Sequence, residues 1–553
     1  MISVMASLFL VALDQTIIST ALGKIVEDFN AFSSLTWVVT AYLITTTITT
    51  PIAGKLSDLF GRRNVILTGV TIFTLGSLLS GTSGDINQLI LWRAFQGIGG
   101  GIIMANAFTI VGDLFAARER GKWQGLIGAV FGIASLVGPL LGGFLTEAHT
   151  IFGMTTDWRW TFFINVPIGI LAFAIIAIFC PPLKHDKKPR VDYAGAGLLA
   201  VILATVVLAV DNTDVIFADL LSSMDMSLTT LRIIMAGIVA VALAAFVAVE
   251  RRVEEPILKL EFFKNRNFLI LSGVAMAVGA GMLGSILYLT QFNQQVFGAT
   301  PTESGLMLMP MIIGLMAASI GVGSLVSKVG RYKVFMLAGF AIATAAIASL
   351  MTLNPDSSFV QEAIIMVFVG IGIGIGMPLM AIATQNEFKQ EDLGIATSTN
   401  QLFRGLGSTI GVAIFGSMLT MGISNSLGDM GNNAYVQTLK QSPAASQILG
   451  DKTNDANTLL TLNMPETKQK ITEGFATGIE KLKVPQPVQQ KLKDDFQAKQ
   501  SEYNDKIVDA YAESMHTIFM FTSSIMFIAF LLSLALKERP LAAASPEQTP
   551  GEI

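Results

Sequence analysis

Two oppositely charged side chains lie inside apolar stretches of the sequence, where a charge is costly. Asp14 is the only acidic residue well inside the first six of these stretches, and Arg93 lies a few residues inside the fourth. A charge at the centre of a bilayer costs about 2.5–3.5 kcal/mol on insertion scales, so Asp14 is expected to face a bundle interior or a wet cavity. A carboxylate removed from water holds a proton more readily, whereas a bound organic cation favours its ionised form. A site that holds either a proton or a cation, but poorly both, predicts exchange of one for the other by simple competition.

Each of these charges also has a structural interpretation. Asp14 can make a polar packing contact with a neighbouring helix, for example to a threonine. Arg93 can pair with a carboxylate or a water network and keep the proton site ready, or it can extend to the outer interface. Arg404, near the cytoplasmic end of a later stretch, is expected to extend to the interface. The next candidates for a coupling carboxylate lie at the ends of apolar stretches: Asp211, Glu387 and Glu513.

The composition is that of a chain that crosses a membrane many times. Of the 553 residues, 52% are hydrophobic and 14% are charged, with a mean hydropathy of +0.61, whereas soluble proteins carry roughly 25% charged residues. A spanning helix needs about 20 mostly apolar residues, and the sequence contains fourteen such stretches. They are 3–22, 36–54, 64–82, 88–111, 123–145, 160–180, 193–210, 230–249, 267–290, 304–326, 334–353, 360–383, 398–422 and 514–536.

The basic residues predict the orientation of these stretches, because Lys and Arg collect in cytoplasmic loops. Every second short loop is basic, which places both termini in the cytoplasm. The loops in between contain almost no basic residues, with Lys24 as the clear exception. After the second, fourth and sixth stretches the basic residues are Lys55, Arg62 and Arg63; Arg118, Arg120 and Lys122; and Lys184, Lys187, Lys188 and Arg190. Further along they are Arg251, Arg252, Lys259, Lys264 and Arg266; Lys328, Arg331 and Lys333; Lys389; and Lys537 and Arg539.

Several classes of function are disfavoured by the same composition. A net charge of −4 gives no signature of nucleic-acid binding. The single Cys180 excludes a disulfide framework, and His149, His185 and His516 lie far apart, so we expect no metal site. No Walker-type phosphate loop occurs, and no nucleophile constellation is visible, so we expect no catalytic residues, no cofactor and no ATP use. An ion gradient, taken here as the proton gradient, remains as the energy source.

The polar segment 424–512 interrupts the apolar pattern. Two sets of apolar residues recur there at helical spacing, separated by Pro485 and Pro487, which predicts a hairpin of two helices, the second continuing into the last stretch. A mobile linker is the alternative. The first set is Ile471, Phe475, Ile479 and Leu482, and the second is Val488, Leu492, Phe496, Tyr503, Ile507 and Tyr511. By the alternation of basic loops this segment lies outside the cell.

An internal repeat relates two basic loops. Residues 54–65 read GKLSDLFGRRNV and residues 323–334 read GSLVSKVGRYKV, and each joins two apolar stretches on the same predicted side. The repeat aligns stretches 1–6 with stretches 9–14 and leaves stretches 7 and 8 as an inserted pair. Repeated halves with a site between them are typical of secondary transporters. The expected domains are a bundle at 1–180, a linker with the inserted pair at 181–266, a second bundle at 267–423, the outer segment 424–512, and the last helix with its tail at 513–553.

Five motifs in order resemble those of one family. GKLSDLFGRR (54–63) resembles the loop signature of the major facilitator superfamily, although Leu59 stands where the family often has a basic residue. LILWRAFQGIGGG (89–101) resembles its fourth-helix motif, and GPLLGG (138–143) resembles the antiporter motif of its fifth helix. LDQTIISTAL (13–22) and DWRWTFFINVPIG (157–169) resemble signatures of its fourteen-span drug:proton antiporters.

The resemblance implies an all-α membrane protein with two six-helix bundles and two additional helices. It assigns proton coupling to Asp14 and Arg93. It also implies a conformational gate at Gly54, Asp58, Gly61, Arg62 and Arg63. In this gate the aspartate lies near a helix N-terminus, where the macrodipole favours an anion, and the loop latches the two halves in the outward-facing state. The alternative is a basic loop that only sets the membrane topology. In the antiporter motif Gly138, Pro139, Gly142 and Gly143 are expected to kink a helix and allow close packing.

The substrate contacts are the least constrained residues of this interpretation. Aromatic and amide side chains in stretches expected to line a cavity are Gln15, Trp37, Tyr42, Tyr288, Gln291 and Phe292. We therefore expect a proton-coupled multidrug antiporter, a monomer in the plasma membrane of a bacterium, that exports lipophilic, cationic compounds by alternating access. Two alternatives stay open: an exporter or flippase of an amphipathic metabolite or lipid, and a non-transporting sensor or assembly protein that acts through the outer segment.

Overall fold

Helices form nearly all of the computed structural model. It describes residues 1–29, 35–146, 150–151, 154–180, 192–210, 213, 217–299, 301–427, 433–440, 462–463, 465–481 and 485–541. The strands in these ranges are one antiparallel pair, β1 (Thr150–Ile151) and β2 (Met154–Thr155). The helices up to residue 180 are α1 (Ile2–Asp28), α2 (Leu35–Phe60), α3 (Arg62–Gly81), α4 (Ile86–Leu114), α5 (Ala117–Thr146), α6 (Trp160–Phe163) and α7 (Asn165–Phe179).

The remaining helices follow the same order along the chain. A pair with a short helix between them comes first: α8 (Tyr193–Val210), α10 (Ala218–Ser223) and α11 (Leu228–Glu250). The next group is η2 (Leu260–Lys264), α12 (Arg266–Gln295), α13 (Pro301–Met307), α14 (Met309–Val329), α15 (Lys333–Ser349), η3 (Leu350–Thr352), α16 (Phe359–Gln385), η4 (Gln390–Asp392) and α17 (Leu393–Leu427). The last are α18 (Ala434–Lys440), α21 (Pro465–Lys481) and α22 (Gln486–Leu534).

Twelve helical stretches among the described residues are long and apolar enough to cross a membrane. They coincide with the third to fourteenth predicted stretches. The first two predicted stretches lie in α1 and α2. In α1 the segment Ile2–Ile18 forms a shorter apolar helix. Twelve spans are therefore shown, and the number fourteen remains a prediction.

Polar residues at the helix ends set where these helices begin. Asp85 accepts a hydrogen bond from the backbone of Gln88 at the start of α4, and Ser358 does the same for α16. Asn265 caps α12 by accepting from two backbone N–H groups. Such caps satisfy donors that a helix leaves unpaired at its first turn. The apolar runs that follow supply the length needed to span the bilayer.

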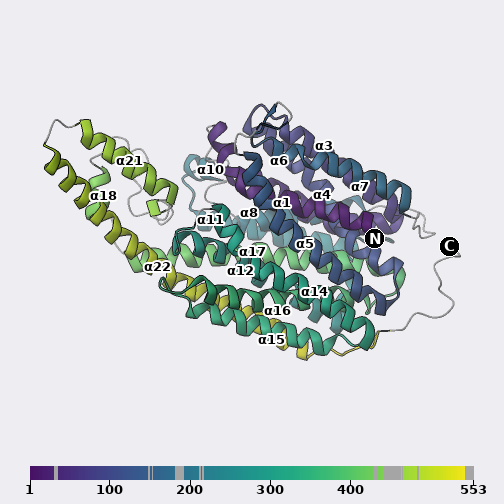
Figure 1. The fold of residues 1–553 in the computed structure, drawn as a ribbon. Helices are drawn as coiled ribbons and strands as arrows, with labels where there is room; N and C mark the ends of the chain where they lie inside the picture. Colours follow the sequence, from purple (N-terminus) through teal and green to yellow (C-terminus); the bar gives the residue numbers. More distant parts are fainter. Residues whose placement is uncertain are drawn as a thin grey trace.

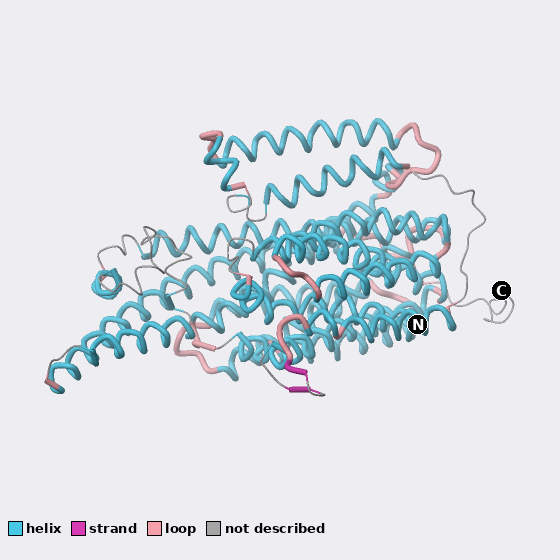
Figure 2. Tube along the Cα trace, turned by 90° about the horizontal axis from the view of Figure 1, so that it is seen from above, coloured by secondary structure: helices cyan, strands magenta, loops and turns pink. Residues whose placement is uncertain are grey.

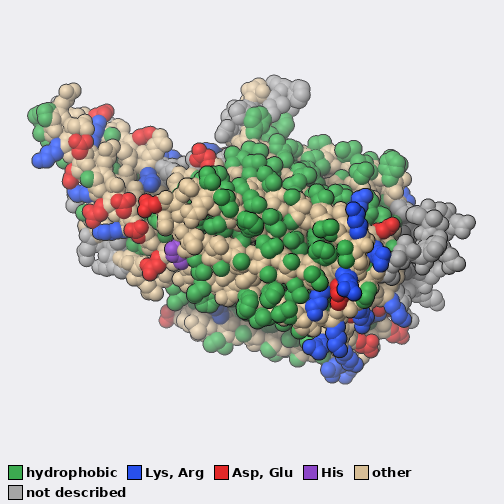
Figure 3. All heavy atoms as spheres, turned by 60° about the horizontal axis from the view of Figure 1, so that its bottom comes forward, with side chains coloured by type: hydrophobic (Ala, Val, Ile, Leu, Met, Phe, Trp, Pro, Cys, Tyr) green, Lys and Arg blue, Asp and Glu red, His purple; other side chains and the backbone are tan. Residues whose placement is uncertain are grey.

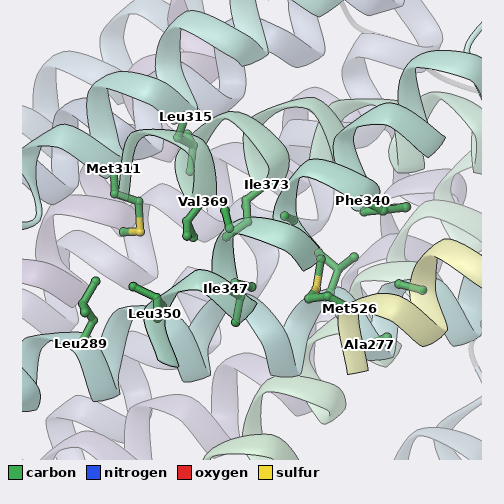
Figure 4. Packing of buried hydrophobic residues seen from close by; sticks show 14 of the residues in the cluster. Ala277, Leu289, Met311, Leu315, Phe340, Ile347, Leu350, Val369, Ile373 and Met526 are labelled. Carbon is green, nitrogen blue, oxygen red and sulfur yellow. The ribbon is translucent and has the colours of Figure 1, made fainter. Parts of the chain in front are cut away.

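Two separate hydrophobic cores show the division into halves. In α1–α7, Leu8, Val11, Phe73 and Ile176 belong to one fully buried cluster. The cluster in α12–α22 is larger, and Figure 4 shows side chains from several helices interdigitating there. Its labelled members include Met311, Leu315, Phe340, Val369, Ile373 and Met526. The inserted helices α8 and α11 pack against each other and form a third cluster, with Leu402 of α17.

The polar segment before the last helix projects from one end of the bundle (Figure 1; Figure 2). The rings of Phe475 in α21 and Phe496 in α22 stack with their centroids 3.9 Å apart. Tyr435 and Tyr503 lie in the same small core, with centroids 5.1 Å apart. The helix α22 continues without a break from this hairpin into the bundle over 49 residues. Leu482, one of the residues expected in the hairpin, is outside the described residues.

Basic side chains gather at the opposite end of the bundle, where the N-terminus lies (Figure 1; Figure 3). Between this end and the hairpin, Figure 3 shows a broad apolar surface. Large exposed hydrophobic residues occur in several helices, among them Leu91, Ile170 and Val241. This distribution is typical of a multi-pass membrane protein, because lipid tails cover the apolar band. We call the basic end, which carries the loop at residues 54–63, the latch end, and the other the hairpin end.

Candidate functional site

Asp14 is held inside the first bundle by three side chains. Its Oδ2 lies 2.7 Å from Nη1 of Arg93 in α4, and its Oδ1 accepts hydrogen bonds of 2.8 Å from Gln96 Nε2 and from Asn165 Nδ2. Asp14 and Arg93 are each 1% exposed. The helices α1, α4 and α7 thus converge on one carboxylate. We call Asp14, Arg93, Gln96 and Asn165 the acid site.

Arg93 is positioned by more than its ion pair. Its Nη1 also donates to Gln96 Oε1 at 2.8 Å, and its Nε contacts the carbonyl oxygen of Val38 at 3.4 Å. The guanidinium lies over the ring of Tyr42, 4.3 Å from the centroid, and 5.7 Å from that of Phe162. A buried ion pair needs such additional partners to offset its desolvation. Arg93 therefore does not extend to the interface.

The geometry of the acid site bears on the expected competition between a proton and a substrate cation. Direct competition requires that the cation reach Asp14. In this conformation both carboxylate oxygens are hydrogen-bonded by neighbours within the first bundle, and the side chain is buried. Contact between a substrate and Asp14 therefore requires another conformation, and simple competition stays a prediction.

The amide partners of Asp14 were missed at the sequence level. Gln96 follows Arg93 by one helical turn, and this spacing places both on one face of α4. Asn165 begins α7 and also contacts Ser77 Oγ at 3.1 Å. Polar residues inside apolar stretches were the available signal, but nothing in the sequence says which helix each one faces.

The loop at residues 54–63 forms an ion-pair cluster at the latch end. Arg62 is fully buried, pairs with Asp58, and places its Nε 2.6 Å from Asp113 Oδ2 at the end of α4. Arg62 Nη1 also donates to Ser57 Oγ, and Arg63 donates to the carbonyl oxygen of Ala177 in α7. These contacts tie α2, α3, α4 and α7 together.

Asp58 also contacts the second half of the protein. A Cβ built on Gly394, the second residue of α17, would lie 2.6 Å from Cγ of Asp58. The carboxylate therefore sits against the N-terminus of α17, where the helix dipole favours an anion. One turn away, a Cβ on Gly54 would lie 2.5 Å from Cβ of Ser398. We call these four residues the latch.

The second copy of the repeat has matching geometry. Gly61 and Gly330, which the repeat aligns, both adopt positive φ angles, 88° and 74°, a conformation that favours glycine. Beside the second copy, Glu538, which follows α22, accepts hydrogen bonds from the backbone N–H groups of Tyr332 and Lys333 at the start of α15. Burial raises the pKa of Tyr332 to about 12. Each copy thus has an acidic residue at a nearby helix N-terminus: Asp58 at α17 and Glu538 at α15.

Further hydrogen bonds join the halves at the latch end. Gln385 Nε2 donates to the carbonyl oxygen of Phe108 at 3.0 Å, and Gln390 Nε2 donates to that of Gly112 at 3.1 Å. Further along α17, a Cβ on Gly405 would meet nothing within 4 Å. This conformation is closed at the latch end.

The antiporter motif packs α5 against α1. Thr16 of α1 donates to the carbonyl oxygen of Ala134, one turn before Gly138. The helix α5 continues through Pro139 as a single element of 30 residues. Carbonyl oxygens of Gly142 and Gly143 accept from Thr146 at 2.7 and 2.9 Å.

Replacing Gly138 with alanine is expected to destabilise the protein by about 1–3 kcal/mol through overpacking. The new Cβ would lie 2.6 Å from Cβ of Thr16 and 3.1 Å from the backbone nitrogen of Ile17, and backbone cannot move aside cheaply. Thermal unfolding in detergent measures the effect. The matched control is Gly321→Ala in α14, where a Cβ meets nothing within 4 Å; equal melting temperatures for the two variants would contradict the prediction.

The residues expected in a substrate cavity are mostly packing residues in this conformation. Tyr42 lies beneath Arg93, and Tyr288 donates to the carbonyl oxygen of Val412 at 2.9 Å. Phe292 is fully buried beside Phe519. A substrate contact by these three would require another conformation. Gln15 and Trp37 are half-buried. Gln291 accepts a hydrogen bond from the Tyr511 hydroxyl.

The other candidate carboxylates lie outside the acid site. Glu387 accepts from Asn267 Nδ2 at 2.7 Å and pairs with Arg539 in the tail. Glu513 accepts from Ser426 at 3.2 Å, and Asp211 is outside the described residues. Among the described residues, no group of three or more His, Cys, Asp and Glu side chains could hold a metal ion; His149 and His185 lie outside them.

Fold and site together define an α-helical membrane transporter built from two bundles. Residues 4–412 match the family described as the Major Facilitator Superfamily, and the chain belongs to it. The chain is 35% identical to the multidrug transporter protein MdtP of Bacillus subtilis over 479 residues, which cover 86% of this chain and 85% of the relative. It is 36% identical to multidrug resistance protein 3 of the same organism, covering 76% and 78%.

More distant proteins share the family and the fold. The efflux pump dotC of Dothistroma septosporum is 32% identical, with 84% of this chain and 78% of the relative covered. The human organic anion transporter MFSD10 has a TM-score of 0.56 at 14% identity, covering 75% of this chain and 92% of that one. The proton:xylose symporter XylE has a TM-score of 0.52 at 16% identity, covering 75% and 87%. These two structures support the fold alone.

Proposed function

We propose that the protein is a proton-coupled multidrug exporter of the plasma membrane that works by alternating access, without a cofactor. The observation that carries this proposal is a buried ion pair, Asp14 with Arg93, in the half that supplies Gly54 and Asp58 to the latch. An intramembrane ion pair is costly, and such pairs mark ion pathways in transporters. The named relatives support drug export, and the proton as the driving ion follows from the chemistry of Asp14.

The acid site couples proton uptake to helix packing. When Asp14 takes up a proton, its ion pair with Arg93 is lost, and a guanidinium is left buried without a counter-ion. An unpaired buried charge is strongly unfavourable, so α1 and α4 have to rearrange around it. The helix α4 also carries Asp113, which pairs with Arg62, and Arg62 in turn pairs with Asp58 of the latch. This rearrangement therefore reaches the contact between the halves.

In this proposal the latch end is the cytoplasmic end, as the positive-inside rule predicts. Because the latch end is closed, we assign this conformation to the outward-facing state of the cycle. In this state a proton enters from outside while cargo leaves. Opening of the latch then exposes Asp14 to the cytoplasmic side, where it releases the proton. The inward movement of protons down their gradient thus drives the export of cargo.

Dye efflux from proteoliposomes tests this proposal. Purified protein with an imposed pH gradient, acidic on the hairpin side, should drive ethidium toward that side, and substrate addition should accelerate proton movement. Collapse of the gradient with a protonophore should stop both. Efflux that continues unchanged without a pH gradient would contradict proton coupling, and dye-stimulated proton flux that lipids compete away would favour a lipid or amphipathic metabolite as cargo.

A further inference from the structure

Arg404 lies at mid-depth in the second half of the protein. It follows Gly394 of the latch by about ten residues of α17, or about 15 Å along a helix. The hydrocarbon core is about 30 Å thick, so Arg404 starts near its midplane, deeper than the cytoplasmic end where the sequence placed it. Asp14 is at a similar depth on α1, about 18 Å from the first residue of that helix.

The contacts of α17 show which of its faces carries Arg404. One face packs on α12, because Cβ atoms on Gly407 and Gly411 would touch Met276 and Ala280. A second face, with Leu402 and Leu406, is covered by the cluster of α8 and α11.

Between these two faces lies a third, which carries Gln401, Arg404 and Gly405. Their i, i+3, i+4 spacing places them together. All three are half-buried. Gly394 and Ser398, which contact α2, lie earlier on the same stripe of α17 at i, i+4, i+7 and i+11 spacing with Gln401 and Gly405, so this face is turned toward the first half. A Cβ on Gly405 would meet nothing within 4 Å.

The polar groups of this face are unsatisfied. Among the described residues the Arg404 side chain makes no ion pair or hydrogen bond, and no carboxylate acts as its counter-ion. The side-chain oxygen of Gln401 is buried without a hydrogen-bond donor. A guanidinium at this depth without a counter-ion is unfavourable, and intramembrane charges of this kind mark functional sites.

We propose that Arg404, with Gln401, binds the acidic group of the cargo at mid-membrane depth. This rests on the proposed export function and adds a substrate class to it: amphiphiles that carry a carboxylate, alone or together with a cation. A carboxylate offers the planar fork geometry that a guanidinium recognises, and Gln401 accepts a hydrogen bond from an N–H or O–H of the same ligand. Cargo without an acid leaves Arg404 unpaired, so the site discriminates against it.

A pair of dyes that differ in one group tests this proposal. Rhodamine 19 carries a free carboxylate, and rhodamine 6G is its ethyl ester. We expect Arg404→Gln to lower export of rhodamine 19 by tenfold or more while changing that of rhodamine 6G by less than threefold. Binding of each dye to the purified protein, followed by fluorescence polarisation in detergent, should show the same selective loss without depending on a proton gradient.

Two further variants define the controls. Arg404→Lys keeps the charge but not the fork, and should retain part of the rhodamine 19 binding. Arg232→Gln removes an exposed arginine at the start of α11 and should affect neither dye. Equal loss of both dyes with Arg404→Gln, or no loss of rhodamine 19 binding, would overturn the proposal. Failure of the wild type to export either dye while rhodamine 19 still binds through Arg404 would instead count against the export function.

Discussion

The Asp14→Asn variant should fold and bind dye but should show no proton movement when substrate is added. Asparagine keeps the shape of the carboxylate and can accept a hydrogen bond from Arg93 through its oxygen. It cannot take up a proton, and it removes the negative charge that Arg93 faces at 2.7 Å. We therefore expect coupled efflux to fall to background, measured as substrate-stimulated pH change in proteoliposomes.

The loss of the buried charge also affects stability, and this needs a control. Breaking a buried pair by removing one partner costs about 3–5 kcal/mol, less where the new amide still accepts a hydrogen bond. The double variant Asp14→Asn with Arg93→Gln should recover stability but not coupling. Asp28→Asn changes a half-exposed aspartate of the same helix, which accepts from Trp158 at 3.0 Å, and should leave coupling intact. Coupling that survives Asp14→Asn would move the proton site elsewhere, with Glu387 and Glu513 next.

The Gly394→Ala variant should shift the protein away from the conformation closed at the latch end. The added methyl carbon would overlap the carboxylate of Asp58. Asp58 is held in place by its ion pair with Arg62, which Asp113 also binds. Overpacking of this kind costs about 1–3 kcal/mol, and only the closed conformation has the clash. Since about 1.4 kcal/mol is a factor of ten in an equilibrium, we expect transport to fall about tenfold or more.

Cysteine labelling measures this shift directly. Cys180 is the only cysteine in the sequence, so a Cys180→Ser background with Thr109→Cys gives one probe. Thr109 is fully buried near the latch end, and in the Gly394→Ala variant it should react faster with a membrane-impermeant maleimide added from that side. Gly197→Ala in α8, where a Cβ meets nothing within 4 Å, is the matched control. Unchanged labelling and transport in Gly394→Ala would show that the latch does not set the conformation.

Hydropathy and short motifs predicted much of this architecture because both are local in sequence. A stretch such as 360–383 must be a buried or lipid-facing helix whatever surrounds it, and α16 covers it. The glycine pair Gly61 and Gly330 is another case: the repeat aligned them, and a sharp turn requires the same backbone conformation in both. Family membership follows from the order of these motifs.

Contacts between helices could not be predicted in the same way. Gln96 and Asn165 bind Asp14 from helices far along the chain, and helix rotation decides which side chains meet. Arg404 shows a related difficulty: its depth depends on where α17 begins, and α17 begins at Leu393, five residues before the predicted stretch. The burial of Asp14 was not predicted either, because the sequence gives the type of residue in a span but not its access to water.

Because α22 is unbroken, the hairpin moves together with the second half of the protein. The 49 residues of this helix extend for about 73 Å, of which about 40 Å lies beyond the span. If the second half turns by about 15°, as domains do in other rigid-body transitions, the far end swings by about 10 Å. The distance between a fluorophore on α21 and one on the first bundle would then change in each turnover. Energy transfer between the two fluorophores could follow the transport cycle in single molecules.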